Sequence, residues 1–353
     1  MKNNRIFKMI EESFPEKIVE GSVVVLTCGG TIAGVGPKDS AIGYTSGALM
    51  GAELLELVPG ASDIAPLLCL DICNKNSDDI TSKDWEKLRA VIKELNLNPA
   101  ISGFVITTGT DTLEELSFYL YLTLNITKPV VITGAMRPST AKEPDGPKNL
   151  LDAVAVASDP KGLSNGRGVM VVFNGRIYNP RFVTKTHTSS LSAIEVSNPH
   201  GVIGVVSLDG VVFTDVIPKG DELMGYFEPL FAGEDNIVKL PKVTVVYFET
   251  DAPKWLLKKA IEKSDGVVIA GAGAGEYSQK WMRIIEEYHN TTQDSERKPI
   301  MISSRVGAGN ILDEQLLLPD YTISAGDLNP QKAAVFLRLL LAKKEREHNG
   351  HNI

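Results

Sequence analysis

Short apolar runs rich in valine and isoleucine alternate along this chain with segments that carry apolar residues at helical spacing. Continuous apolar runs are typical of strands that are covered on both faces, as in parallel sheets. In the first part of the chain, we expect strands at 23–26, 64–72, 104–106 and 130–132. We expect helices at about 46–58, with Thr45 or Ser46 as the cap, and at 82–95, 113–124 and 149–157. This order predicts an α/β fold with a mainly parallel sheet and helices on both faces.

The pattern changes after Gly168, where four expected strands follow one another without helices between them, at 169–173, 176–178, 202–206 and 211–213. Residues 215–240 are irregular and rich in glycine and acidic residues, and we interpret them as a linker. A second alternation follows, with strands at 243–248, 267–270 and 300–303 and helices at 253–263, 277–289 and from Pro330. The sequence therefore predicts a larger N-terminal α/β domain over 1–214 and a smaller C-terminal domain with a parallel sheet over 241–353.

Composition excludes several classes of protein. The net charge of −8, from 36 basic and 44 acidic residues, argues against a nucleic-acid partner. No apolar run reaches the roughly 18 residues of a membrane helix, so we expect no membrane partner. No apolar signal segment follows Met1, which makes a cytoplasmic location the expectation. The three cysteines predict reduced thiols, with Cys28 sensitive to oxidation if it is exposed.

Two of the expected strands end in glycine followed by threonine. Thr31 follows a pair of glycines, and Thr110 and Asp111 follow Gly109. In open α/β sheets, sites lie at the carboxyl ends of strands, and glycine there lets a substrate approach the backbone. A hydroxyl in that place suits a nucleophile, although Asp111 would ordinarily be the N-cap of the following helix. Two such hydroxyls predict one site assembled from two strands.

Further polar loops follow other expected strands or lie close to the first threonine. They carry Tyr44, then Ser77 with Asp78, then the stretch that begins at Ala135, and finally Lys185. The strand-end rule predicts that several of them meet at one edge of the sheet. The ordinary alternatives are an aromatic packing role for Tyr44 and a solvated surface position for Lys185. The glycine loop lacks G-x-G-x-x-G and G-K-[ST], and no histidines stand at metal-ligand spacing, so we expect neither a cofactor nor a metal.

Nine segments occur together in an order that resembles one family. They read T-C-G-G-T-I-A-G, S-D-D-I, I-T-T-G-T-D-T-L-E-E, G-A-M-R-P-S, D-G-P-K-N-L, V-T-K-T, A-G-A-G-A-G, S-S-R-V and L-N-P-Q-K-A. From about Val23 to the C-terminal helix, the chain resembles the bacterial-type L-asparaginases. The resemblance implies hydrolysis of the side-chain amide of L-asparagine to L-aspartate and ammonia, without a cofactor. It also implies a homotetramer built as a dimer of dimers.

Matching positions carry the roles that the resemblance implies. Thr31 would be the nucleophile, with the Tyr44 phenol beside it. A second group would comprise the residues Thr110, Asp111 and Lys185. The substrate-binding positions would be Ser77 and Asp78 for the α-carboxylate and α-amino groups, Ala135, and Glu314 from a neighbouring subunit. An unperturbed tyrosine or lysine titrates near ~10, so either needs its pKa lowered to act as a base at neutral pH.

Several alternatives stay open at the level of sequence. Covalent acyl transfer and direct attack by water both fit the residues. Asp78 and Ala274 depart from residues that are common in relatives, and Glu276 either substitutes for the contact missing at Ala274 or faces solvent, which leaves the preference between asparagine and glutamine undecided. A broader glutaminase-asparaginase is the nearest rival. The amidase subunit of a tRNA-dependent amidotransferase would carry an added N-terminal domain, and the set of Thr31 with Lys185 argues against a binding protein without activity.

Overall fold

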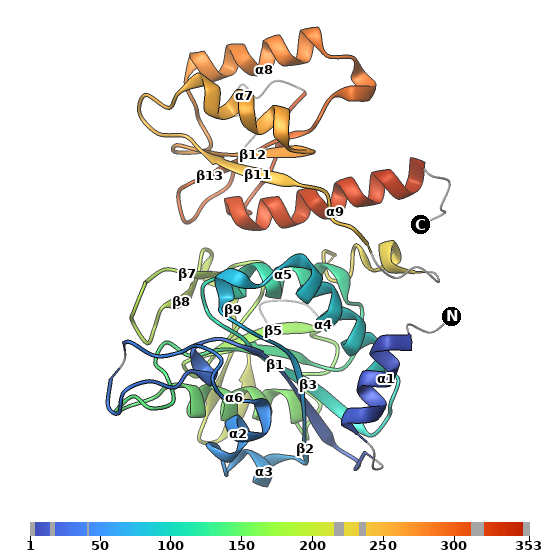
Figure 1. Cartoon of the computed structure of the whole chain (residues 1–353), viewed down its shortest axis with the longest axis vertical. Helices are drawn as coiled ribbons and strands as arrows, with labels where there is room; N and C mark the ends of the chain where they lie inside the picture. The colour runs from blue at the N-terminus through green and yellow to red at the C-terminus, as the bar shows by residue number, and fades with distance from the viewer. Residues whose placement is uncertain are drawn as a thin grey trace. The chain divides into compact units, whose positions relative to one another are not determined.

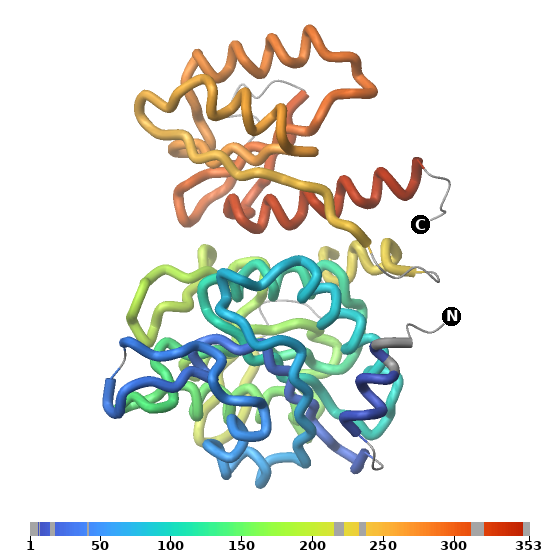
Figure 2. Tube along the Cα trace, in the orientation of Figure 1, coloured from blue at the N-terminus to red at the C-terminus, as the bar shows by residue number. Residues whose placement is uncertain are grey.

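The computed structural model describes residues 4–14, 18–40, 42–214, 222–232, 238–311 and 321–348. The chain divides into two compact units, Met1–Ile237 and Val238–Ile353. Figure 2 shows the path of the chain, which runs from blue to yellow through the first unit and from orange to red through the second. Each unit is an α/β structure around its own sheet.

The first unit contains an eight-stranded sheet in the described residues, in the order β10-β9-β6-β5-β4-β3-β1-β2. Strands β2, β1, β3, β4 and β5 are parallel, and β6, β9 and β10 extend the sheet with antiparallel pairs. The strands are β1 Ser22–Gly29, β2 Leu67–Lys75, β3 Ile101–Thr107, β4 Val130–Thr133, β5 Val169–Phe173, β6 Arg176–Tyr178, β9 Val202–Ser207 and β10 Gly210–Phe213.

Helices cover both faces of this sheet (Figure 1), with α4 and α5 on one face and α2, α3 and α6 on the other. The helices of the unit are α1 Asn4–Ser13, α2 Gly51–Glu56, α3 Ala61–Ile64, α4 Ser82–Leu95, α5 Leu113–Thr123 and α6 Gly146–Ser158. Because each face is covered, the side chains of 23–26 in β1 are all fully buried. The predicted mainly parallel sheet is confirmed.

The chain reverses its direction of winding between β1 and β3. From β1 it continues to β2 on one side, and β3 then pairs with β1 on the other side. The carboxyl ends of these two strands therefore flank a topological switch point, where open α/β sheets bind ligands. Thr31 follows β1 and Thr110 follows β3, so the sheet brings together the two ends that the sequence singled out.

Two local predictions were wrong, and one element was missed. The helix expected from Thr45 or Ser46 begins only at Gly51, and the second strand begins at Leu67 because Ala61–Ile64 forms the short helix α3. A small antiparallel pair, β7 Val183–Lys185 and β8 Ile194–Val196, was not predicted. Strands of three residues are too short to show an alternating pattern.

The segment between the predicted domains is only partly described. Residues 215–221 and 233–237 lie outside the described residues, whereas 222–232 includes a 3-10 turn, Glu228–Phe231. Leu230 and Phe231 in this turn are buried, and the Arg89 guanidinium lies 3.8 Å from the centre of the Phe231 ring. This part of the segment therefore packs as a piece of the first unit.

The second unit has a four-stranded parallel sheet in its described part, in the order β11-β12-β13-β14. Helices α7 and α8 lie on one face and α9 on the other (Figure 1). The elements are β11 Val243–Tyr247, β12 Gly266–Gly271, β13 Ile300–Ser304, β14 Ile323–Ser324, α7 Lys254–Lys263, α8 Gln279–Thr291 and α9 Pro330–His348. The predicted smaller parallel-sheet part is confirmed. Across both units, the described helices include none with the length and apolar character to cross a membrane.

Candidate active site

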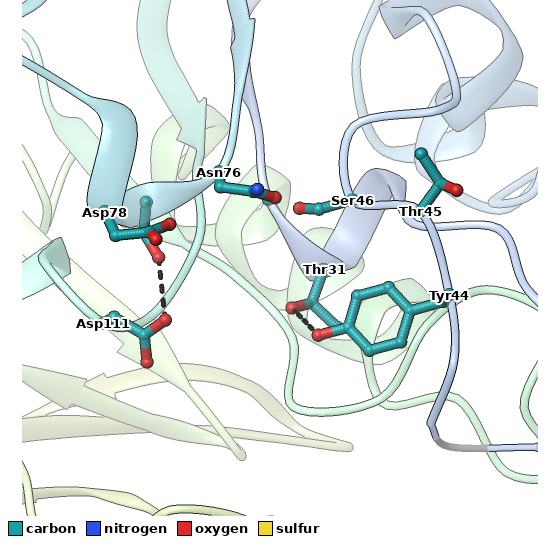
Figure 3. A pocket seen from close by; sticks show the side chains of 9 residues that line it. Thr31, Tyr44, Thr45, Ser46, Asn76, Asp78 and Asp111 are labelled. Carbon is teal, nitrogen blue, oxygen red and sulfur yellow. Dashed lines mark hydrogen bonds between the residues drawn. The ribbon is translucent and has the colours of Figure 1, made fainter.

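A cavity of about 450 Å³ opens at the carboxyl ends of β1, β2 and β3. Figure 3 shows it from close by, with hydroxyl, amide and carboxylate groups gathered around it. Its lining is polar, and all of it comes from the first unit. The lining residues are Gly30, Thr31, Tyr44, Thr45, Ser46, Asn76, Ser77, Asp78 and Asp111.

Glycines bring the ends of β1 and β3 into direct backbone contact. Gly30 has a φ of 83°, a conformation that side chains with a Cβ rarely adopt. A Cβ built on Gly30 would lie 2.2 Å from the backbone nitrogen of Gly109. A Cβ on Gly109 would in turn lie 2.7 Å from the Cβ of Ser77. The two loops can therefore approach this closely only with glycine at these positions.

The first hydroxyl pair joins Thr31 and Tyr44. Thr31 begins a 3-10 turn directly after the glycines, and its Oγ1 lies 2.8 Å from the Tyr44 phenol oxygen. Thr45, next to Tyr44, exchanges two backbone hydrogen bonds with Val35, which fixes the loop that carries the phenol. Figure 3 shows the two hydroxyl groups directed at each other on the cavity wall. A proton can pass between them without movement of the backbone.

The second group joins the consecutive residues Thr110 and Asp111 to Lys185, which lies 74 positions beyond Asp111 in the sequence. The Lys185 ammonium donates to Thr110 Oγ1 at 2.9 Å and to Asp111 Oδ1 at 2.6 Å. Thr110 is buried, and the side chain of Lys185 is only 17% exposed. Lys185 reaches this position at the end of β7, where it pairs with Ile194 of β8. Lys185 is therefore not a solvated surface lysine.

Asp111 connects the second group to the cavity. Its other carboxylate oxygen accepts a hydrogen bond from the Ser77 hydroxyl at 3.0 Å. The hydrogen bond from Lys185 lowers the pKa of Asp111, with a further contribution from Ser77, against partial burial, which raises it. The N-cap of α5 is Thr112, so Asp111 does not occupy the ordinary capping position considered for it. A carboxylate whose ionised form is favoured by Lys185 and Ser77 thus borders the cavity.

Hydrogen bonds to side chains at the N-terminal end of α6 fix the loop after β4. The Asp145 carboxylate accepts from the backbone N–H groups of Met136 and Arg137, each at 2.9 Å. Asn149 donates to the Gly134 carbonyl at 3.0 Å. Ala135 between them is completely buried and is not among the residues that line the cavity.

The remaining predicted positions fall in different places. Asp78 lines the cavity, as do Ser77 and Asp111. Glu314 lies outside the described residues. Sequence reasoning missed the cavity positions of Thr45, Ser46 and Asn76. Their positions in the sequence could have indicated this, because Asn76 directly precedes Ser77, and Thr45 and Ser46 directly follow Tyr44.

The cysteines lie beside the site rather than in it. All three are free thiols, and Cys28 is fully buried, so the exposure that would make it sensitive to oxidation is absent. Hydrogen bonding with the Cys73 thiol and burial both raise the pKa of the Cys28 thiol. Within the described ranges, no three His, Cys, Asp or Glu side chains form a group able to hold a metal ion.

Comparison with known proteins gives one consistent result. Residues 22–216 match the family "Asparaginase, N-terminal", and residues 242–352 match "Glutaminase/Asparaginase C-terminal domain". The chain is 34% identical to "L-asparaginase 2" of Bacillus subtilis, over 95% of this chain and 86% of that protein. It is 36% identical to "Probable L-asparaginase periplasmic" of Haemophilus influenzae, over 91% and 89%, and 32% identical to "Glutaminase-asparaginase" of Acinetobacter glutaminasificans, over 92% and 96%.

Solved structures agree with the sequence matches. The crystal structure of the probable cytoplasmic L-asparaginase from Campylobacter jejuni is similar, with a TM-score of 0.79 and 35% identity, over 93% of this chain and 98% of that one. The chain belongs to the asparaginase family of hydrolases that act on amides. The resemblance seen in the sequence motifs is confirmed.

Proposed function

We propose that this protein hydrolyses the side-chain amide of L-asparagine to L-aspartate and ammonia, with Thr31 as the nucleophile. One observation supports this most directly. Two threonine hydroxyls at one switch point are each hydrogen-bonded to a proton carrier, Thr31 to the Tyr44 phenol and Thr110 to the Lys185 ammonium. Amide hydrolysis needs a nucleophile and a group that delivers a proton to the leaving ammonia.

The proposed reaction begins with attack of Thr31 Oγ1 on the amide carbon. The Tyr44 phenol takes the threonine proton and gives its own hydroxyl proton to the leaving nitrogen, which departs as ammonia when its bond to carbon breaks. The ester on Thr31 is then hydrolysed by water, which restores the threonine and releases aspartate. In the second group, Asp111 holds the Lys185 ammonium, and Thr110 lies where it can orient the water or relay its proton.

The opposite part of the cavity would hold the backbone groups of the amino acid. The carboxylates of Asp111 and Asp78 suit a protonated α-amino group. In this proposal, the Ser77 side chain lies between these two carboxylates and the α-carboxylate of the substrate. Two negative charges so close together favour a cationic amine over a neutral ligand. The substrate would therefore be a free amino acid rather than an amide within a peptide.

Release of ammonia tests the proposal. Purified protein is offered L-asparagine and L-glutamine in parallel over a range of concentrations. Release from asparagine at low concentration, with little from glutamine, is the expected result. Absence of release from both, with the protein folded by circular dichroism, would overturn the proposal.

A second candidate is a glutaminase-asparaginase that uses both substrates. It is favoured by the relative from Acinetobacter glutaminasificans that carries this name. Comparable kcat/KM values for the two amino acids would identify this broader enzyme. Trapping of an ester on Thr31 by rapid acid quench and mass spectrometry would separate covalent transfer from direct attack by water.

We further propose a cytoplasmic homotetramer built as a dimer of dimers, in which Glu314 completes the site of a neighbouring subunit. The Campylobacter jejuni relative is titled cytoplasmic, whereas the Haemophilus influenzae relative is named periplasmic. Sedimentation velocity together with activity on dilution tests the assembly. Full activity in a proven monomer would contradict the role of Glu314, and cell fractionation tests the location.

A further inference from the structure

Apart from Thr45, two side chains that line the cavity have no part in the reaction proposed above. They are the hydroxyl of Ser46 and the amide of Asn76. Figure 3 shows these side chains pointing toward each other across the cavity. Neither makes a side-chain hydrogen bond to any of the described residues, so both are available to a ligand.

The other lining side chains leave a shortage of hydrogen-bond donors. The single proton of the Ser77 hydroxyl is directed to Asp111, and Thr31 and Tyr44 share one hydrogen bond. Asp78 and Asp111 are carboxylates, which accept hydrogen bonds and cannot donate them when ionised. A substrate with an α-carboxylate therefore needs donors from elsewhere on this wall, because the two acidic side chains would repel it.

Asn76 is held in place to supply such a donor. It directly precedes the 3-10 turn Ser77–Asp79 with an extended backbone, and its carbonyl accepts the N–H of Asp79 at 3.1 Å. On the facing loop, Gly47 donates its N–H to the Gly30 carbonyl at 3.1 Å, which fixes the neighbouring Ser46 close to the glycine pair before Thr31. The amide of Asn76 and the hydroxyl of Ser46 are thus carried by two backbone segments that are each held by a hydrogen bond.

We propose that Asn76, assisted by Ser46, binds the α-carboxylate of the substrate and selects amides that carry this group free. The inference rests on the proposed function, since it concerns the same cavity. It assigns to Asn76 a contact that the proton of Ser77 cannot make while it is bonded to Asp111. Selectivity for a free amino acid then comes from two sides, with Asp78 and Asp111 for the amine and Asn76 with Ser46 for the carboxylate.

The test removes the amide from the protein and the carboxylate from the substrate. The kcat/KM of the wild type and of Asn76→Ala is measured with L-asparagine and with 3-aminopropanamide, which is asparagine without its α-carboxylate. Loss of one hydrogen bond to a charged group lowers kcat/KM by roughly 10- to 100-fold. We expect this loss with asparagine, chiefly through KM, and almost none with 3-aminopropanamide.

Matched variants sharpen the result. Asn76→Asp keeps the size of the side chain but replaces a donor with a third carboxylate, so its loss with asparagine should exceed that of Asn76→Ala. Ser46→Ala should show a smaller loss of the same selective kind. Ser207→Ala is the control, because this exposed hydroxyl on β9 is not among the residues that line the cavity, and it should behave as wild type.

The outcomes separate this inference from the proposed function. Equal losses with both substrates, or no loss with asparagine, would overturn the role of Asn76 while leaving asparaginase activity established. Calorimetric titration with L-aspartate and with β-alanine, which lacks the α-carboxylate, makes the same comparison without turnover. If the wild type hydrolyses no amide, the proposed function fails. In that case, aspartate binding that Asn76→Ala weakens still supports the inference, and the absence of such binding or of such weakening overturns it.

Discussion

Both units end parallel strands in glycines and hydroxyl residues, yet the hydroxyls have different partners. In the first unit, Thr31 lies against a phenol and Thr110 against an ammonium. In the second unit, β13 ends in Ser303 and Ser304, and both hydroxyls donate to backbone carbonyls, Ser303 to Leu328 at 2.8 Å and Ser304 to Gly273.

This difference separates a site from a structural turn. A hydroxyl that donates to a carbonyl has committed its proton to holding two segments together. A hydroxyl beside a tyrosine or a lysine can exchange its proton with a group that titrates. A hydroxyl at a strand end therefore indicates chemistry only when a proton carrier stands beside it, and the comparison predicts opposite effects of removing hydroxyls in the two units.

The largest effect is expected for Thr31→Val, which replaces a hydroxyl with a methyl group of similar size. Loss of the nucleophile should lower kcat by about 10⁴-fold or more. Steady-state ammonia release measures the loss, and circular dichroism checks that the fold is intact. Thr31→Ser, which keeps a hydroxyl, should retain far more activity than Thr31→Val. Normal turnover by the valine variant would remove Thr31 from the reaction.

The next largest effect is expected for Lys185→Met, which keeps the length of the side chain and removes its charge. Removal of a proton-transfer group costs roughly 10²- to 10⁴-fold in rate. The loss should fall on kcat more than on KM, because Lys185 is not among the residues that line the cavity. An unchanged kcat would show that Lys185 only supports Asp111.

A smaller effect concerns the ionisation of Asp111. Because its pKa is lowered in the folded protein, its ionised form stabilises the fold above the ordinary aspartate pKa of ~3.9, and this contribution is lost as the pH falls through the lowered value. Lys185→Met should raise the pKa of Asp111, and Ser77→Ala should raise it less. Carboxyl NMR titration measures both, with Asp84, which pairs with Lys75 at 2.8 Å, as an internal reference. An Asp111 pKa that does not move in Lys185→Met would contradict the pairing.

The smallest effect on activity is expected for Ser303→Ala in the second unit. Ser303 is fully buried, and its removal leaves the Leu328 carbonyl without this partner, which costs about 1 kcal/mol of stability. Thermal unfolding should therefore begin at a lower temperature while kcat and KM stay at their wild-type values. A loss of turnover as large as that of Lys185→Met would break the distinction between the two units.

Much of the fold could be predicted because its strands are apolar throughout. Residues 169–173 form β5 as expected, since the side chains of a fully buried strand leave a continuous apolar run. Residues 176–178 form β6 as expected, although Arg176 at its start is exposed. The expected helix at 113–124 ends one residue earlier, at Thr123. The hairpin at Val183–Lys185 could not be predicted, because its existence depends on pairing with residues nine or more positions away.

The site was predictable in its parts and not in its contacts. Motif order identified Thr31, Thr110 and Lys185, but no periodicity shows that Lys185 reaches across 74 residues of sequence to Asp111. Ser46 was interpreted as a possible helix cap because hydroxyl residues often hold that position. In the folded chain, α2 begins five residues later and Ser46 faces the cavity instead. Local preference could not anticipate this, since the loop is fixed by backbone hydrogen bonds to Gly30, Ala33 and Val35, which depend on the fold.

The backbone contact between Gly30 and Gly109 limits how this site can diverge. Because no side chain separates the two loops, the spacing between the nucleophile and the second hydroxyl group cannot be adjusted in small steps by exchanging residues there. If Asn76 and Ser46 bind the α-carboxylate as proposed, substrate preference can instead change through residues on the cavity wall. The reaction geometry and the substrate preference can therefore evolve separately within one cavity.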